Sequence, residues 1–247
     1  MYLLPLQVLG AAALCVTAGA QDDITRANLT LSNLQVNFMT SPLGIDRLSS
    51  VHFSWELPAA PRPGLTQQSA RLTVSSAGGE VVFDSGAIAT ARPELSVDLG
   101  KALRSDAVYT WAVDVSAGSG ASAALTVAAA AEASFSTGLL EKTDWVAEWI
   151  RGGTQCRTEF DVPADMVVRR ASMFVAACQY YTLALDGRPV GDQVLDGPWT
   201  SFYTNRSYTT HDIAPALLSP GRHALGLRVG EGFCTSAPQD MYLLATP

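Results

Sequence analysis

Charge is scarce in this chain, and positive charge is scarcest. Only 16% of its 247 residues are charged, and 16 Lys and Arg face 23 Asp and Glu, for a formal net charge of −7 at pH 7. We expect no nucleic-acid partner, because proteins that bind a phosphate backbone concentrate Lys and Arg. An anionic membrane surface is an equally poor partner for such a chain. Long helices with paired Glu and Lys faces are not expected either.

Motifs for catalysis and cofactor binding are also missing. The sequence has no Gly-x-Ser-x-Gly elbow, no Walker loop and no dinucleotide-binding fingerprint. The histidines are His52, His211 and His223, and none forms a metal-type pair. His211 and Asp212 are neighbours in an expected strand, so their side chains point to opposite faces and cannot easily share a proton. We therefore assign no catalytic residue and expect no cofactor.

Cysteine is rare, with four residues in the whole chain. Cys15 lies in the apolar N-terminal segment, which leaves Cys156, Cys178 and Cys234. An odd number allows one disulfide and one free thiol, but the spacing does not give the pairing. Cys178 follows an apolar run, so a small buried side chain is the alternative interpretation.

The first twenty residues are apolar and end in Ala18-Gly19-Ala20, after which the sequence turns polar. This pattern predicts a signal peptide over residues 1–20, cleaved after Ala20, and hence a secreted protein. A membrane anchor is the alternative, but the segment is barely long enough and lacks a basic flank. Two sequons then make Asn28 and Asn205 candidate glycosylation sites.

Residues 30–140 consist of short alternating segments separated by turn residues, which predicts a β-sandwich of the fibronectin type III or immunoglobulin kind. In residues 31–38 the expected buried face carries Leu34, Val36 and Phe38. Trp55 and Trp111 are expected in the core rather than on a sugar-stacking surface, because alternation groups them with Phe and Val. The expected strands cover residues 31–38, 51–55, 70–74, 81–86, 108–115 and 124–135.

Residues 141–247 predict a second antiparallel sandwich, a jelly roll of the galactose-binding-like, carbohydrate-binding kind. Asp186-Gly187 is a turn signal, because both residues tolerate positive φ. The chain closes on an apolar, strand-like segment, residues 241–247. A sandwich that stops there would expose an edge, so we expect this unit to continue in the natural protein or to be truncated. The predicted class is thus all-β, with two sandwich domains.

One loop of the second unit combines carboxylates with aromatic residues. Asp192 and Asp196 lie in a Gly- and Pro-containing stretch, with Trp199 and Tyr203 close behind. Aromatic rings cover the apolar face of a sugar, so these residues are the candidate carbohydrate-binding site. The alternative is that the Asp residues cap turns and the aromatic rings enter the core. The same carboxylates are candidate ligands for a structural Ca²⁺, although the regular acidic spacing of a calcium loop is absent.

Short segments in a fixed order give the chain a family resemblance over residues 34–233. It resembles the opening of the bacterial and fungal α-L-rhamnosidases, family 78 of the glycoside hydrolases. The segments are Pro42-Leu43-Gly44-Ile45-Asp46, Phe53-Ser54-Trp55-Glu56-Leu57, Phe83-Asp84-Ser85-Gly86, Tyr109-Thr110-Trp111-Ala112-Val113, Phe135-Ser136-Thr137-Gly138, Asp144-Trp145-Val146-Ala147-Glu148-Trp149, Tyr180-Tyr181-Thr182-Leu183-Ala184-Leu185-Asp186-Gly187 and Gly230-Glu231-Gly232-Phe233.

The resemblance implies a fibronectin-like sandwich followed by a jelly roll, with catalysis in a later helical barrel that this chain does not contain. The expected function is that of a non-catalytic front part which supports or binds rhamnose-containing glycans. Two alternatives are a fragment of an enzyme that hydrolyses terminal α-L-rhamnose and a stand-alone adhesion-type protein. Asp186 stands where the family usually has Asn in this turn, a departure that bears on sugar binding more than on the fold.

Overall fold

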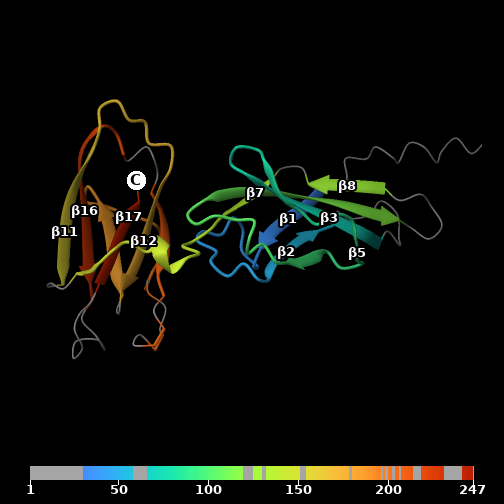
Figure 1. Cartoon of the computed structure of the whole chain (residues 1–247), viewed down its shortest axis with the longest axis horizontal. Helices are drawn as coiled ribbons and strands as arrows, with labels where there is room; N and C mark the ends of the chain where they lie inside the picture. Colours follow the sequence, from blue (N-terminus) through green and yellow to red (C-terminus); the bar gives the residue numbers. More distant parts are fainter. Residues whose placement is uncertain are drawn as a thin grey trace, which may run out of the picture.

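We describe the protein from a computed structural model. It covers residues 30–57, 66–118, 125–129, 132–150, 154–177, 180–195, 197, 200–201, 204–205, 207–213, 218–230 and 241–246, with the backbone alone for strands β8, β10 and β17. The expected signal peptide lies outside the described residues, as do Asn28, Cys178, Asp196, Trp199, Tyr203 and Cys234. The described part is all-β apart from a single short 3-10 turn, which confirms the predicted fold class. Two sandwiches lie side by side (Figure 1).

The first sandwich is a nine-stranded sheet that wraps around one core in the order β4-β3-β7-β8-β1-β2-β6. Strand β5 pairs with β3, and β9 pairs with β7. The strands are β1 (Thr30–Val36), β2 (Val51–Glu56), β3 (Thr66–Ser76), β4 (Val81–Asp84), β5 (Ile88–Ala89), β6 (Glu94–Val97), β7 (Val108–Gly118), β8 (Leu125–Ala129) and β9 (Ala133–Ser136).

Alternation along β7 fills this core as predicted. Tyr109, Trp111, Val113 and Val115 are all buried. Trp55 on β2 is buried as well, and its indole Nε1 donates to Gln67 Oε1 at 3.1 Å. Both tryptophans therefore serve the core, which confirms that prediction and removes them as sugar-stacking rings.

The predicted burial of residues 31–38 is fully correct only at Val36, and Leu31, expected on the opposite face, is buried as well. A bulge between Ser32 and Gln35, with Asn33 at φ +47°, shifts the alternation, so Leu34 is only half-buried. A tight turn then places Phe38 at φ +64° and leaves its side chain 73% exposed. Positive φ at bulky residues breaks the two-residue period, and the composition gave no sign of it.

The predicted single strand over residues 124–135 is also wrong, because two strands occupy this stretch. Strand β8 pairs with residues 114–117 of β7, whereas β9 pairs with residues 108–111 of the same strand. Strand β8 additionally runs parallel to β1. One long strand, β7, therefore pairs with β8 along its second half and with β9 along its first half.

The second sandwich consists of two four-stranded sheets around its own core. One has the order β10-β17-β12-β15 and the other β11-β16-β13-β14. The strands are β10 (Trp149–Ile150), β11 (Gln155–Val162), β12 (Ala171–Ala177), β13 (Tyr181–Leu185), β14 (Arg188–Pro189), β15 (Thr209–Ile213), β16 (Gly221–Val229) and β17 (Met241–Thr246). Strand β17 confirms the predicted terminal strand, and it pairs between β10 and β12 rather than at an edge.

The predicted Asp186-Gly187 turn is confirmed between β13 and β14. Both residues have positive φ, +50° and +76°, as a two-residue hairpin turn of this kind requires. The Asp186 carboxylate does more than turn the chain. One oxygen accepts from the backbone N–H of Ala224 at 2.7 Å, and the other lies 2.7 Å from His223 Nδ1, so the turn is bonded to β16.

Strand β12 is buried on both faces, unlike an ordinary sandwich strand. Met173 and Val175 point into the core of the second sandwich. Phe174 and Ala176 alternate with them and point to the other face, yet they are also buried. The Phe174 ring packs edge-on against Tyr208 at 5.7 Å between centroids. The outer face of this sheet is therefore covered at Phe174 by Tyr208, and the paired Thr210 lies against Gly44 of the first sandwich.

Candidate functional site

The predicted sugar-binding loop is described only in part. Asp192 is exposed, after Gly191 at φ +77°, and it precedes Val194 and Leu195, which are 85% and 67% exposed. Asp196, Trp199 and Tyr203 lie outside the described residues, so the grouping of these four side chains stays a prediction. Exposed apolar residues next to a carboxylate are compatible with a ligand-contacting loop.

The other site-related predictions also stay predictions. Asn205 is exposed, as a glycan acceptor must be, and its backbone N–H donates to Ser201 O at 2.7 Å. Among the described residues no group of three or more His, Cys, Asp and Glu side chains could hold a metal ion. Cys156 is a half-buried thiol. In the part of the chain that the structure describes, no helix is long and apolar enough to cross a membrane.

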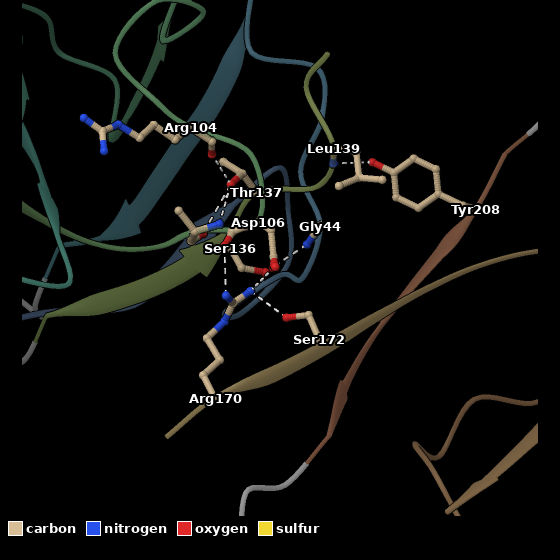
Figure 2. Close-up of polar contacts among 10 residues, drawn as sticks. Gly44, Arg104, Asp106, Ser136, Thr137, Leu139, Arg170, Ser172 and Tyr208 are labelled. Carbon is tan, nitrogen blue, oxygen red and sulfur yellow. Dashed lines mark hydrogen bonds and ion pairs between the residues drawn. The ribbon is translucent and has the colours of Figure 1, made fainter. Parts of the chain in front are cut away.

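A cluster of long-range polar contacts lies at the junction of the two sandwiches (Figure 2). Arg170, just before β12, donates from Nη1 to the backbone oxygen of Asp106 at 2.8 Å, and its Nη2 pairs with the Asp106 carboxylate. The same Nη2 donates to Ser172 Oγ at 2.6 Å. Asp106 belongs to the first sandwich and Arg170 to the second. We call these three residues the clasp.

Tyr208 is a second bond across the junction. Its hydroxyl accepts from the backbone N–H of Leu139 at 2.9 Å (Figure 2). Burial raises the pKa of Tyr208 to about 12, and the nearby Asp46 carboxylate adds to the rise. The ring lies between Trp145 and Phe174, with centroids 5.8 Å and 5.7 Å away. Tyr208 is therefore a neutral anchor of the second sandwich, held by apolar packing and by hydrogen bonding to the first sandwich.

Two glycines permit this close approach. A Cβ on Gly44 would overlap the Thr210 side chain, and a Cβ on Gly138 would overlap the Tyr208 hydroxyl. Gly44 also has φ +69°, where glycine carries no steric penalty. Its N–H donates to Ser136 Oγ at 3.0 Å, so the loop is held against the end of β9.

The segment that leaves the first sandwich is bonded back to it. Ser105 Oγ accepts from the Leu140 N–H at 2.8 Å and donates to the Asp144 carboxylate. That carboxylate also accepts from the Glu141 N–H at 3.0 Å, which closes the short 3-10 turn Lys142–Asp144. The connection between the sandwiches thus begins as ordered structure and fixes the direction in which the second unit starts.

A cleft of about 480 Å³ lies beside the clasp and is lined by both sandwiches. The first sandwich contributes the loop around Pro42 and the end of β9, and the second contributes β12, β15 and the segment before β12. His211 is buried here, with Nε2 2.8 Å from the Tyr181 hydroxyl, whereas Asp212 is exposed. His211 and Asp212 therefore lie on opposite faces of β15, as the alternation of strand residues predicts.

Two family models match the chain in order. Residues 31–141 match the Rha78A-like, N-terminal immunoglobulin domain, and residues 166–242 match the alpha-L-rhamnosidase N-terminal domain. The chain belongs to the N-terminal regions of the α-L-rhamnosidases. A curated alpha-L-rhamnosidase from Formosa agariphila is 24% identical over 242 residues, which is 84% of this chain and 25% of that protein. The family resemblance seen in the sequence is thereby confirmed.

Solved structures agree on the fold of this rhamnosidase region. The alpha-L-rhamnosidase from Dictyoglumus thermophilum superposes with a TM-score of 0.73 at 23% identity, over 87% of this chain and 27% of that one. The enzyme from Aspergillus terreus gives 0.70 at 23% identity, over 88% and 27%. The chain thus spans about a quarter of the length of the relatives it matches.

Sequence reasoning missed the junction of this rhamnosidase region. Residues 173–177, the last five of β12, form an unbroken apolar run, which is typical of a strand buried on both faces rather than of one alternating strand. That run was the available signal. No local pattern links Arg170 to Asp106, because the two residues are 64 positions apart.

Proposed function

We propose that the chain is the non-catalytic front part of a secreted α-L-rhamnosidase, and that its two sandwiches act as one rigid support. The observation that carries this proposal is the junction itself. A charged clasp, a buried Tyr208 anchor and two glycines needed for contact join the sandwiches. Such a support would hold the exposed loop at Asp192 in a fixed direction relative to the first sandwich.

The support role predicts cooperative unfolding. Two sandwiches that depend on each other for burial should melt in one calorimetric transition whose van't Hoff and calorimetric enthalpies agree. The test uses the whole chain and a clasp variant, Arg170→Ala. Separation of the variant's melt into two transitions would support the proposal, whereas two independent transitions in the unaltered chain would contradict it.

The absence of catalysis from this part is tested directly. The purified chain should not hydrolyse an aryl α-L-rhamnoside, since the described cleft is lined by one carboxylate, Asp212, whereas glycoside hydrolysis requires a pair. Turnover that a single Asp or Glu substitution abolishes would show that the chain is an enzyme in its own right.

The carbohydrate-binding part of the proposal concerns rhamnose-containing glycans. Support comes from the exposed Asp192 loop and from the family to which the chain belongs. Calorimetric titration with L-rhamnose, with and without Ca²⁺, should give heat at millimolar sugar. An Asp192→Asn variant should lose part of it, and the matched control is Asp165→Asn, an exposed carboxylate in another loop of the same sandwich.

A further inference from the structure

The cleft beside the clasp has polar groups that the fold itself leaves unused. Arg169 and Asp212 both line it, and both are exposed. Among the described residues neither side chain makes a hydrogen bond or an ion pair, whereas neighbouring Arg170 is fully occupied by Asp106 and Ser172. Arg169 and Asp212 therefore leave a guanidinium and a carboxylate available among the residues that line one cavity.

The charges that line the cleft balance one another. Arg170 is neutralised by the Asp106 carboxylate, and the positive charge of Arg169 is offset by the negative charge of Asp212. An anionic ligand such as a phosphate would meet this carboxylate, and a cation would meet the guanidinium. The balance favours a neutral ligand that can both donate hydrogen bonds to a carboxylate and accept them from a guanidinium.

The rest of the lining suits a small polyhydroxylated molecule. Hydroxyl groups come from both sandwiches, and an apolar wall is formed by Pro42, Leu43 and Val108. The volume of about 480 Å³ lies within the range of roughly 300–1,000 Å³ that small-molecule sites occupy. The lining hydroxyls are Ser41, Ser134, Ser136, Ser172 and Thr210.

We propose that this cleft between the sandwiches binds a neutral saccharide, with Arg169 donating to and Asp212 accepting from adjacent hydroxyls of one sugar ring. The choice of rhamnose as the first ligand rests on the proposed function; the site itself does not. A sugar in this position touches both sandwiches, so its binding would add to the clasp and stabilise their contact. The site is separate from the Asp192 loop.

The test is a titration of the whole chain with L-rhamnose, followed by D-galactose and D-glucose, read by calorimetry and by backbone amide shifts. The expected shifts fall on residues 41–43, 134–136 and 210–212. Arg169→Ala and Asp212→Asn should each weaken binding about tenfold, the usual effect of losing a hydrogen bond to a charged group. Both positions are exposed, so the variants should keep the melting temperature of the unaltered chain.

Two matched controls separate this site from the loop. Arg188→Ala removes an exposed guanidinium and Asp165→Asn an exposed carboxylate, both outside the cleft and outside the Asp192 loop. Neither should change binding at the cleft. Loss of binding in Asp192→Asn alone would overturn this inference and leave the proposed carbohydrate function standing. No binding of any of the three sugars would overturn both, while the support role would still be judged by the melting experiment.

Discussion

The hydroxyl of Tyr208 accepts a 2.9 Å hydrogen bond from the backbone N–H of Leu139, and the two residues belong to different sandwiches. The bond satisfies a backbone donor, and the rings of Trp145 and Phe174 partly shield the Tyr208 side chain from water. A half-buried backbone N–H is thus paired by a hydroxyl of the neighbouring unit. The two sandwiches depend on each other for hydrogen bonding as well as for packing.

Replacement of Tyr208 by Phe should destabilise the chain by about 1–3 kcal/mol, because the Leu139 N–H loses its acceptor while the ring packing is kept. Urea unfolding followed by fluorescence measures the change. The control is Tyr180→Phe, at a tyrosine that is 51% exposed and should change stability by less than about 0.5 kcal/mol. Equal effects at the two positions would contradict the anchoring role.

Gly44→Ala should cost about 1–3 kcal/mol more than Gly79→Ala. Both glycines have positive φ, +69° and +83°, so both alanines bear backbone strain. Only the Cβ at position 44 overlaps a neighbour, Thr210, whereas nothing lies within 4 Å at position 79. The difference in the free energy of unfolding therefore measures the contact between the sandwiches. A further Thr210→Ala substitution should recover part of the loss in Gly44→Ala and none in Gly79→Ala.

Arg170→Ala should destabilise the chain by about 1.5–3 kcal/mol. The substitution removes several hydrogen bonds made by a charged group, and the half-buried Asp106 carboxylate loses its ion pair with Arg170. Arg71→Ala breaks an ion pair with Asp84 that is more exposed, so it should cost less stability than Arg170→Ala. The Arg71 effect should also fade at high salt, while the Arg170 effect persists. Thermal melts at low and high ionic strength decide the point.

The His223 cluster predicts a stability that depends on pH. The Ser219 carbonyl and the Asp186 carboxylate face the two ring nitrogens, at 2.6 Å and 2.7 Å, and they raise the pKa of His223 above 6.5. A raised folded-state pKa stabilises the fold below the unfolded value and loses that contribution as the pH rises through the folded value. Stability should therefore decline above pH 6.5 in the unaltered chain.

The same cluster also makes the stability of the fold fall at acidic pH. The Ala224 N–H and then His223 lower the pKa of the Asp186 carboxyl below 3.8, so its contribution is present above that value and is lost as the pH falls through the folded pKa. Urea midpoints between acid and alkaline pH should show both slopes. His223→Gln should reduce the decline in stability above pH 6.5. His52→Gln, in the other sandwich, should leave that decline unchanged. An unchanged slope in His223→Gln would refute the assignment.

Periodicity and turn chemistry predicted much of the fold. The alternation along β7, the two core tryptophans and the Asp186-Gly187 turn follow from residue type and spacing alone. The errors came where the backbone leaves the extended region. Positive φ at Asn33 and Phe38 ends the alternation in the structure, although the apolar pattern of the sequence continues to Phe38.

The junction could not be predicted in the same way. Its partners are far apart in the chain, such as Gly44 with Thr210 and Arg170 with Asp106, and no local period relates them. The predicted sugar-binding loop differs from the junction, where the partners are far apart in the chain. Its residues are close in sequence, but proximity in sequence does not decide whether Asp192 and the aromatic residues share one ligand.

The double burial of β12 limits how this region can be divided. Its outer face carries the buried Phe174, which packs against Tyr208, and the paired Thr210 lies against Gly44 of the first sandwich. If the second sandwich were expressed by itself, part of this apolar surface would be exposed to water, and the domain would tend to self-associate. Protein engineers who move these modules between enzymes should therefore transplant them as a pair, or first replace Phe174 with a polar residue.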